Sequence, residues 1–165
     1  MKKITLLSAI AMIAFTVNSF AQSATGSSTT TVIAPLTITA GTDLAFGNVT
    51  EDGSGGTVTI TAVTGATATG ADGAQAVDGT VTAGSFDVGG ETGNGYSITL
   101  PSATTTLTGE TTGTPSIAVT ELNTNIAEGT IDTDGTFYVG GIITLAADQP
   151  ADIYSGTYTV TVQYN

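Results

Sequence analysis

The stretch Thr157-Tyr158-Thr159-Val160-Thr161-Val162-Gln163-Tyr164 alternates strictly between large apolar and polar side chains. Successive side chains of a β-strand point to opposite faces, so one face of this segment is apolar and the other is mostly hydroxylic. Residues 57–62 and 96–100 show the same period of two. This alternation is typical of half-buried strands, and we find no helical spacing of apolar residues beyond residue 21. The sequence therefore predicts an all-β domain.

Turn signals such as Asp52-Gly53, Asp72-Gly73 and Asn94-Gly95 separate the alternating runs. Their residues tolerate the positive φ angles that tight hairpins need. The stretch 64–75, rich in Gly, Ala and Thr, is expected to be a long loop or a weak edge region. Short strands at intervals of about 8–12 residues favour an antiparallel β-sandwich or a β-barrel. We expect strands at about 29–39, 44–49, 57–63, 76–82, 84–88, 95–100, 104–107, 116–122, 128–133, 136–146 and 156–164.

The beginning of the chain predicts a secretory signal peptide over residues 1–21. Lys2 and Lys3 precede an apolar run, which closes on the small-x-small site Ser19-Phe20-Ala21. Residues 22–31 are small and polar, and we expect a flexible extension there. Residues 32–165 would form the β-sandwich. The signal predicts export through the periplasm to the cell surface or medium, with no membrane insertion after cleavage.

Cleavage at this site would leave a chain with no basic side chain. Residues 22–165 carry all 14 acidic residues and contain no Lys, Arg, His, Cys or Trp. Nucleic acids and anionic membrane surfaces are repelled by such a chain. Metal sites built on His or Cys and Ser-His-Asp nucleophiles are excluded. Carboxylate pairs could hydrolyse glycosides, but the acids lie beside turn signals or on polar faces. We therefore expect a non-enzymatic protein without a cofactor.

Five segments carry a family resemblance. They are Val32-Ile33-Ala34-Pro35-Leu36-Thr37-Ile38, Asp43-Leu44-Ala45-Phe46-Gly47, Tyr96-Ser97-Ile98-Thr99-Leu100-Pro101, Phe137-Tyr138-Val139-Gly140-Gly141 and Gly156-Thr157-Tyr158-Thr159-Val160-Thr161-Val162-Gln163-Tyr164. In this order and spacing the chain resembles the bacterial secreted family called domain of unknown function 4402. Its opening and ending are also similar to spore coat U type pilins of chaperone–usher systems. That similarity implies an immunoglobulin-like sandwich, a periplasmic chaperone and a role in surface fibres.

The pilin similarity also implies an assembly mechanism, in which an N-terminal extension completes the sheet of a neighbouring subunit. The C-terminal strand, with Tyr158, Val160, Val162 and Tyr164, would then line the acceptor groove. A donor strand needs alternating large apolar side chains, and residues 22–31 offer only Ala24. A donor segment would therefore have to include Val32, Leu36 and Ile38.

Two groups of residues suggest ligands, and each has a structural alternative. Asp132-Thr133-Asp134-Gly135 begins like a calcium loop, in which oxygen ligands alternate along the chain. It also suits a polar hairpin turn, and Glu51-Asp52 has the same ambiguity. Tyr154, Tyr158 and Tyr164 could form a sugar-binding platform. Alternatively, Tyr158 and Tyr164 are core members of the last strand, with Tyr154 exposed.

These observations favour an exported structural subunit of the cell surface, pilin-like or fibre-forming and adhesive. Its partners would be further copies of itself or other surface proteins. One alternative is a monomeric secreted module that binds carbohydrate or Ca²⁺. Another is a secreted matrix protein with no specific ligand.

Overall fold

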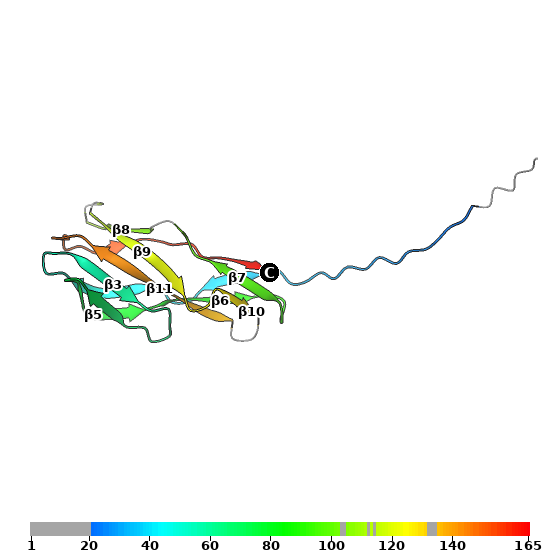
Figure 1. Cartoon of the computed structure of the whole chain (residues 1–165), viewed down its shortest axis with the longest axis horizontal. Helices are drawn as coiled ribbons and strands as arrows, with labels where there is room; N and C mark the ends of the chain where they lie inside the picture. The colour runs from blue at the N-terminus through cyan, green and yellow to red at the C-terminus, as the bar shows by residue number, and fades with distance from the viewer. Residues whose placement is uncertain (1–20, 103–104, 112, 114, 132–134) are drawn as a thin grey trace, which may run out of the picture. The chain divides into compact units, whose positions relative to one another are not determined.

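The computed structural model describes residues 21–102, 105–111, 113, 115–131 and 135–165. All regular structure in these residues is β-strand, without a helix, which confirms the all-β prediction. Residues 33–165 form one compact unit (Figure 1). Residues 21–31 contain no strand, and each of them is exposed.

The strands of the first half of the unit are β1 (Thr37–Ala40), β2 (Ala45–Thr50), β3 (Gly56–Ile60), β4 (Ala68–Ala71), β5 (Gln75–Thr82), β6 (Gly84–Gly89) and β7 (Gly95–Thr99). The strands of the second half are β8 (Thr105–Gly109), β9 (Ser116–Thr124), β10 (Glu128–Thr130), β11 (Thr136–Leu145), β12 (Tyr154–Ser155) and β13 (Thr161–Tyr164).

The strands form one large sheet and two small ones, with antiparallel pairing throughout. The large sheet has the order β1-β6-β11-β9-β8-β12, and β3 joins it beside β11 with β4 on its far side. One small sheet has the order β10-β7-β13, and the other consists of β2 and β5. The chain passes from β5 to β6 through Ala83 alone, and it therefore crosses directly from a small sheet to the large one.

The central strand β11 has two successive partners along one edge. β6 pairs with residues 136–139 and β3 with residues 141–145. Gly140 lies between these two segments. A Cβ atom at Gly140 would collide with the carbonyl oxygen of Ile60 and lie 2.7 Å from the backbone nitrogen of Ala62. Glycine allows this close approach of two backbones, so it permits β3 to replace β6 at this point.

The large sheet packs against both small sheets, which gives a β-sandwich with two main core clusters. Ile143 and Leu145 of β11 pack with residues of β2 and β5 in the first cluster. Phe137 and Val139 pack with residues of β7 and β13 in the second cluster. All four side chains are buried, as expected for alternate positions of one strand. Figure 1 shows β3 and β5 toward the opposite end of the domain from β7 and β10.

The strand expected at residues 29–39 begins only at Thr37. Two side chains form hydrogen bonds with the backbone of Ala34, which precedes β1. The Ala34 amide donates to a Glu91 carboxylate oxygen at 3.2 Å, and the Ala34 carbonyl accepts from the Tyr164 hydroxyl at 2.8 Å. The next residue, Pro35, has no amide hydrogen to offer a neighbouring strand. The β-branched residues before Ala34 therefore remain outside the sheets.

Two other segments differ from, or refine, the expected strand pattern. Of the strand expected at 156–164, only β13 (Thr161–Tyr164) forms, and it pairs with β7. β12 lies just before the expected strand and pairs with β8, so the chain changes partner between the two. In the stretch 64–75, the edge-region alternative is right for β4, which pairs only with β3 among the described residues. Asp72 and Gly73 then turn the chain into β5 with φ angles of 54° and 96°.

Candidate functional site

A groove runs between β2 and residues 149–158, a segment that includes β12. Its volume is about 1010 Å³, which lies at the upper end of the range for ligand pockets. The two walls come from parts of the chain that are far apart in sequence. The groove is therefore a product of the tertiary fold and could not be located from either segment alone.

The floor of the groove is apolar and belongs to the sandwich interior. Leu107, Ile117, Ile143 and Leu145, all members of the first core cluster or packed against it, line the groove together with Phe86. Ile143 is only 2% exposed, so the groove reaches down to side chains of the core. An occupant with apolar side chains would therefore extend the core and remove apolar surface from water.

Two strand edges border the groove. Among the described residues, β2 pairs only with β5 and β12 pairs only with β8. At one end of the groove Gly53, just after β2, lies beside Asp148. At the other end Leu44, just before β2, and the Tyr158 hydroxyl both lie beside Gly84. β2 and the segment that contains β12 therefore run in opposite directions. Edges of this kind present N–H and C=O groups that a further strand can bind.

The charged groups at the groove are all carboxylates: Asp43, Glu51 and Asp152. Asp152 accepts hydrogen bonds from the Thr111 hydroxyl at 2.7 Å and from the Thr111 amide at 3.1 Å. The bond from the Thr111 side chain is the main cause that holds the pKa of Asp152 below its usual value. None of the described residues that line the groove is basic. The groove is therefore a negatively charged site with an apolar floor.

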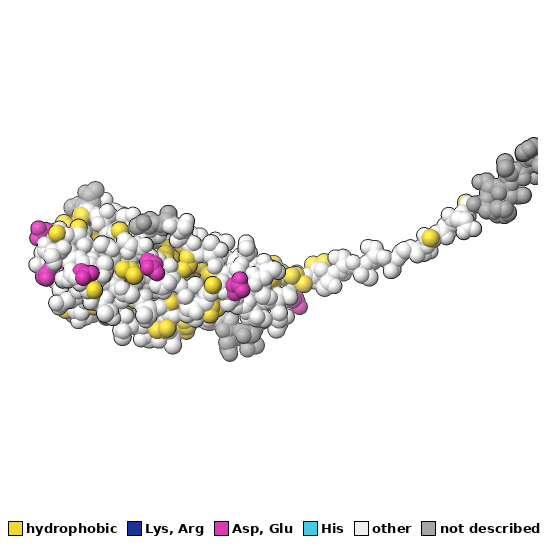
Figure 2. Space-filling view, viewed as in Figure 1, with side chains coloured by type: hydrophobic (Ala, Val, Ile, Leu, Met, Phe, Trp, Pro, Cys, Tyr) yellow, Lys and Arg dark blue, Asp and Glu magenta, His cyan; other side chains and the backbone are white. Residues whose placement is uncertain are grey.

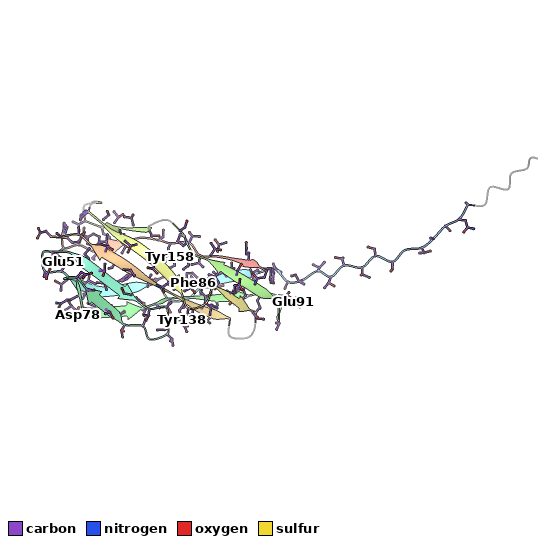
Figure 3. The ribbon with its side chains drawn as sticks, viewed as in Figure 1. Glu51, Asp78, Phe86, Glu91, Tyr138 and Tyr158 are labelled. Atoms are coloured by element: carbon purple, nitrogen blue, oxygen red, sulfur yellow. The ribbon has the colours of Figure 1, made fainter. Side chains whose placement is uncertain are left out.

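Tyr158 lines the groove where it approaches the second core cluster. Its ring meets Phe86 edge-on, with the ring centroids 6.0 Å apart, and Figure 3 shows the two residues near the middle of the domain. Burial, helped by the negative charge of Asp43, raises the pKa of Tyr158 to about 12. The hydroxyl therefore stays protonated well above neutral pH.

The predicted assembly residues of the C-terminal strand share one face. Tyr158, Val160, Val162 and Tyr164 are half-buried and pack against the second core cluster, whereas Thr157, Thr159, Thr161 and Gln163 are exposed. The alternation expected from the sequence is present even where the strand is interrupted. Of the four inward residues, Tyr158 alone lines the groove described above. A role of this strand in assembly stays a prediction.

The three residues of the candidate donor segment lie in different environments. Val32 is 90% exposed. Leu36 and Ile38 pack against the second core cluster, and Ile38 pairs with Val88 through β1. Two of the three side chains are therefore already engaged in the chain's own fold.

The tyrosines are placed as structural members of the domain. The Tyr154 side chain is half-buried rather than exposed, because its hydroxyl donates to the Pro150 carbonyl at 2.6 Å and accepts from Gln149 at 2.8 Å. Tyr164 packs in the second core cluster and its hydroxyl binds backbone groups. The core alternative therefore describes Tyr158 and Tyr164 well. Tyr154 and Tyr158 nevertheless both line the groove.

The candidate calcium ligands Asp132 and Asp134 lie outside the described residues. At the second acidic turn, Glu51 accepts hydrogen bonds from the amides of Gly53 and Gly55. Asp52 accepts from the Ser54 hydroxyl, which is the main cause that lowers its pKa. Within the described part of the chain, no three Asp or Glu residues gather closely enough to hold a metal ion. Both carboxylates of this turn therefore serve its own hydrogen bonding.

Sequence reasoning missed the wall formed by β2 and the floor residue Leu107. The sequence around both shows only a short alternation of apolar and polar residues. This alternation predicts a strand, but it does not indicate which edge of the strand stays unpaired. Pairing is decided by segments distant along the chain, so the groove needed the tertiary structure to be seen.

The fold and the groove define a class of protein: an all-β sandwich with two open strand edges beside an apolar, acidic groove. The chain belongs to the family described as domain of unknown function (DUF4402), whose family model matches residues 36–164. The match covers every described strand, from Thr37 to Tyr164. It confirms the resemblance to this family. Searches of curated proteins and of solved structures found no match. No helix among the described residues is long and apolar enough to cross a membrane.

Proposed function

We propose that this protein is an exported, non-enzymatic structural subunit of the cell surface. It joins other protein chains by strand pairing at the groove between β2 and β12, and so takes part in a pilin-like or fibrous, adhesive assembly. Export rests on the signal peptide predicted for residues 1–21. A periplasmic chaperone would protect the open strand edges on the way out.

The groove is the observation that carries this proposal. It combines an apolar floor drawn from the core with two unpaired strand edges. Natural proteins usually cover or blunt such edges, because unpaired edges invite pairing with other chains. Acidic residues flank both edge segments, but no second strand among the described residues pairs with β2 or with β12. Association by strand addition explains why these edges stay open.

The chemistry of the residues supports a structural rather than a catalytic role. Residues 22–165 contain no His, Cys, Lys or Arg, which removes thiol nucleophiles, imidazole and amine bases and cationic transition-state stabilisers. The carboxylates of Glu51 and Asp52 accept hydrogen bonds from their own turn, and the Asp152 carboxylate accepts from Thr111, which is distant in sequence. They serve the turns of the domain instead of facing one another across a reacting bond.

Electron microscopy of material sheared from the cell surface, with gold-labelled antibody to this protein, tests the proposal. We expect labelled fibres or patches in the parent strain and none in a strain that lacks the gene. The protein released by shearing should begin at Gln22, which mass spectrometry of the intact chain would establish. Bare cells together with a protein that is purely monomeric would contradict the proposal.

A second candidate function is a monomeric module for carbohydrate. It is favoured by the placement of Tyr154 and Tyr158 with three carboxylates in one groove, because sugars stack on aromatic rings and hydrogen-bond to carboxylates. This function predicts a monomer whose thermal midpoint rises with added oligosaccharides. The Ca²⁺ variant of this alternative predicts a rise with CaCl₂ that Asp132→Asn abolishes.

A further inference from the structure

The size and lining of the groove limit which strand can fill it, and this argument rests on the proposed function. A volume of about 1010 Å³ above an apolar floor calls for several large apolar side chains. Small or polar side chains would leave voids above the apolar floor, and unfilled apolar space is destabilising. The occupant is therefore a strand with large apolar residues at alternate positions.

The chain's own N-terminal extension does not meet this requirement. Even when the extension is lengthened to residue 33, its large apolar residues are only Val32 and Ile33, which are adjacent in sequence. Successive side chains of a strand point to opposite faces, so only one of the two could reach the floor. The remaining positions from 22 to 31 are Gln, Ser, Thr, Gly and Ala. Such a strand would leave most of the groove unfilled.

The next residues along the chain are committed elsewhere. Leu36 and Ile38 pack against the second core cluster, and β1 is paired with β6 over its whole length. Ala34 is held by hydrogen bonds to Glu91 and Tyr164. A second copy could donate Leu36 and Ile38 only after breaking these contacts in its own domain.

The negative charge of the groove also disfavours a second copy of this chain as the occupant. Asp43, Glu51 and Asp152 lie at the groove without a basic neighbour among its lining residues. The only Lys and Arg residues of the chain are Lys2 and Lys3, in the predicted signal peptide. Figure 2 shows carboxylates and no basic side chain on the visible face. A second copy therefore brings further negative charge, whereas a different protein can bring Lys or Arg.

We infer that the groove binds an extended segment of a different protein, with large apolar residues at alternate positions and Lys or Arg at its ends. The segment lies between β2 and β12. Because these border strands run in opposite directions, it is antiparallel to one of them and parallel to the other. Its apolar side chains contact Leu107, Ile117 and Ile143, and its basic ends face Asp43 and Asp152.

The absence of Cys from the chain allows a clean binding assay on the purified protein. Ser155→Cys places a single environment-sensitive fluorophore on an exposed residue that lines the groove. Thr130→Cys places the same label on β10, outside the groove, as a matched control. Two probes are synthetic peptides of about nine residues, long enough to span β2 at about 3.3 Å per residue. One alternates Val and Thr between Lys ends, and the other has the same centre between Glu ends. The third probe is the longer peptide of residues 22–33.

We expect the Lys-ended peptide to change the fluorescence at position 155 only, and to bind about tenfold more tightly than the Glu-ended peptide at low salt. Added NaCl should reduce this difference. Asp43→Asn should weaken binding of the Lys-ended peptide several-fold, whereas Glu128→Gln, which removes the same charge from β10, should leave it unchanged. Unaltered thermal midpoints would establish that both variants are folded.

The other outcomes overturn the inference in distinguishable ways. If the peptide of residues 22–33, or a second copy of the protein, fills the groove as tightly as the Lys-ended peptide, the partner is this chain itself and the proposed function stands. If no peptide and no second copy changes the fluorescence at position 155, both the inference and the proposed function are wrong.

Discussion

Tyr158 should make the stability of the domain sensitive to alkaline pH. Its pKa in the folded protein is raised to about 12, whereas an unfolded tyrosine titrates near 10. The folded state therefore favours the neutral phenol, and this contribution is complete below about pH 10 and is lost between about pH 10 and 12. We expect the thermal midpoint to fall in that window. Tyr158→Phe should show a smaller fall over the same window, and an identical fall would contradict the assignment.

Gly140 should be intolerant of any side chain, because a Cβ atom there would collide with the backbone of residues 60–62. We expect Gly140→Ala to lower the free energy of unfolding by about 2–3 kcal/mol, measured by urea denaturation. Gly26→Ala is the matched control, because a Cβ atom at Gly26 has no neighbour within 4 Å. It should change stability by less than about 0.5 kcal/mol. Equal effects of the two substitutions would show that the change of partner on β11 does not depend on glycine.

At the scale of elements, the C-terminal strand β13 should hold the N-terminal segment in place. The Tyr164 hydroxyl donates to the Ala34 carbonyl at 2.8 Å and accepts from the Glu91 amide at 2.9 Å. Tyr164→Phe should cost about 1–2 kcal/mol of stability and speed hydrogen exchange at the Glu91 amide. In Tyr138→Phe, which removes a hydroxyl with no hydrogen bond among the described residues, the Glu91 amide should exchange as in the parent protein. Unchanged exchange in Tyr164→Phe would contradict this role.

Strand content could be predicted from the sequence because strands of a sandwich alternate apolar and polar residues. The strict alternation over residues 157–164 placed the inward side chains correctly. It could not show that the chain changes partner between β12 and β13, since an uninterrupted pattern of side chains carries no information about the neighbouring strand. The β-branched residues 29–33 have strand propensity, yet they have no partner among the described residues, and propensity alone does not make a strand.

The candidate site was harder to predict than the strands. The alternation of the last strand predicts Tyr158 as a site residue, whereas the sequence of β2 predicts only one of several short strands. The groove arises because β2 and β12 are both edges, which depends on the order of strands in the sheets. Strand order is set by contacts between residues far apart in sequence, and the local pattern does not encode those contacts.

For the whole molecule, the position of its two basic residues predicts resistance to trypsin. Trypsin cleaves after Lys and Arg, and beyond Lys3 the chain contains neither. We expect residues 22–165, the protein left after cleavage of the predicted signal peptide, to keep their full mass after trypsin treatment, both folded and after heating. Chymotrypsin, which cleaves after aromatic residues, should digest the heated protein and serves as the control for unfolding. Internal tryptic fragments at any temperature would contradict the prediction.

The late position of the central strand has a consequence for how the domain folds. β11, at residues 136–145, supplies the partner for β3, β6 and β9, and its side chains lie in both main clusters. A chain that emerges N-terminus first, from a ribosome or across a membrane, therefore holds these three strands without their shared neighbour until residues 136–145 have appeared. Such long-range pairing folds slowly. The order of the strands thus delays the closing of the large sheet until β11 has emerged, and the preceding strands can pass through a narrow channel unfolded until then.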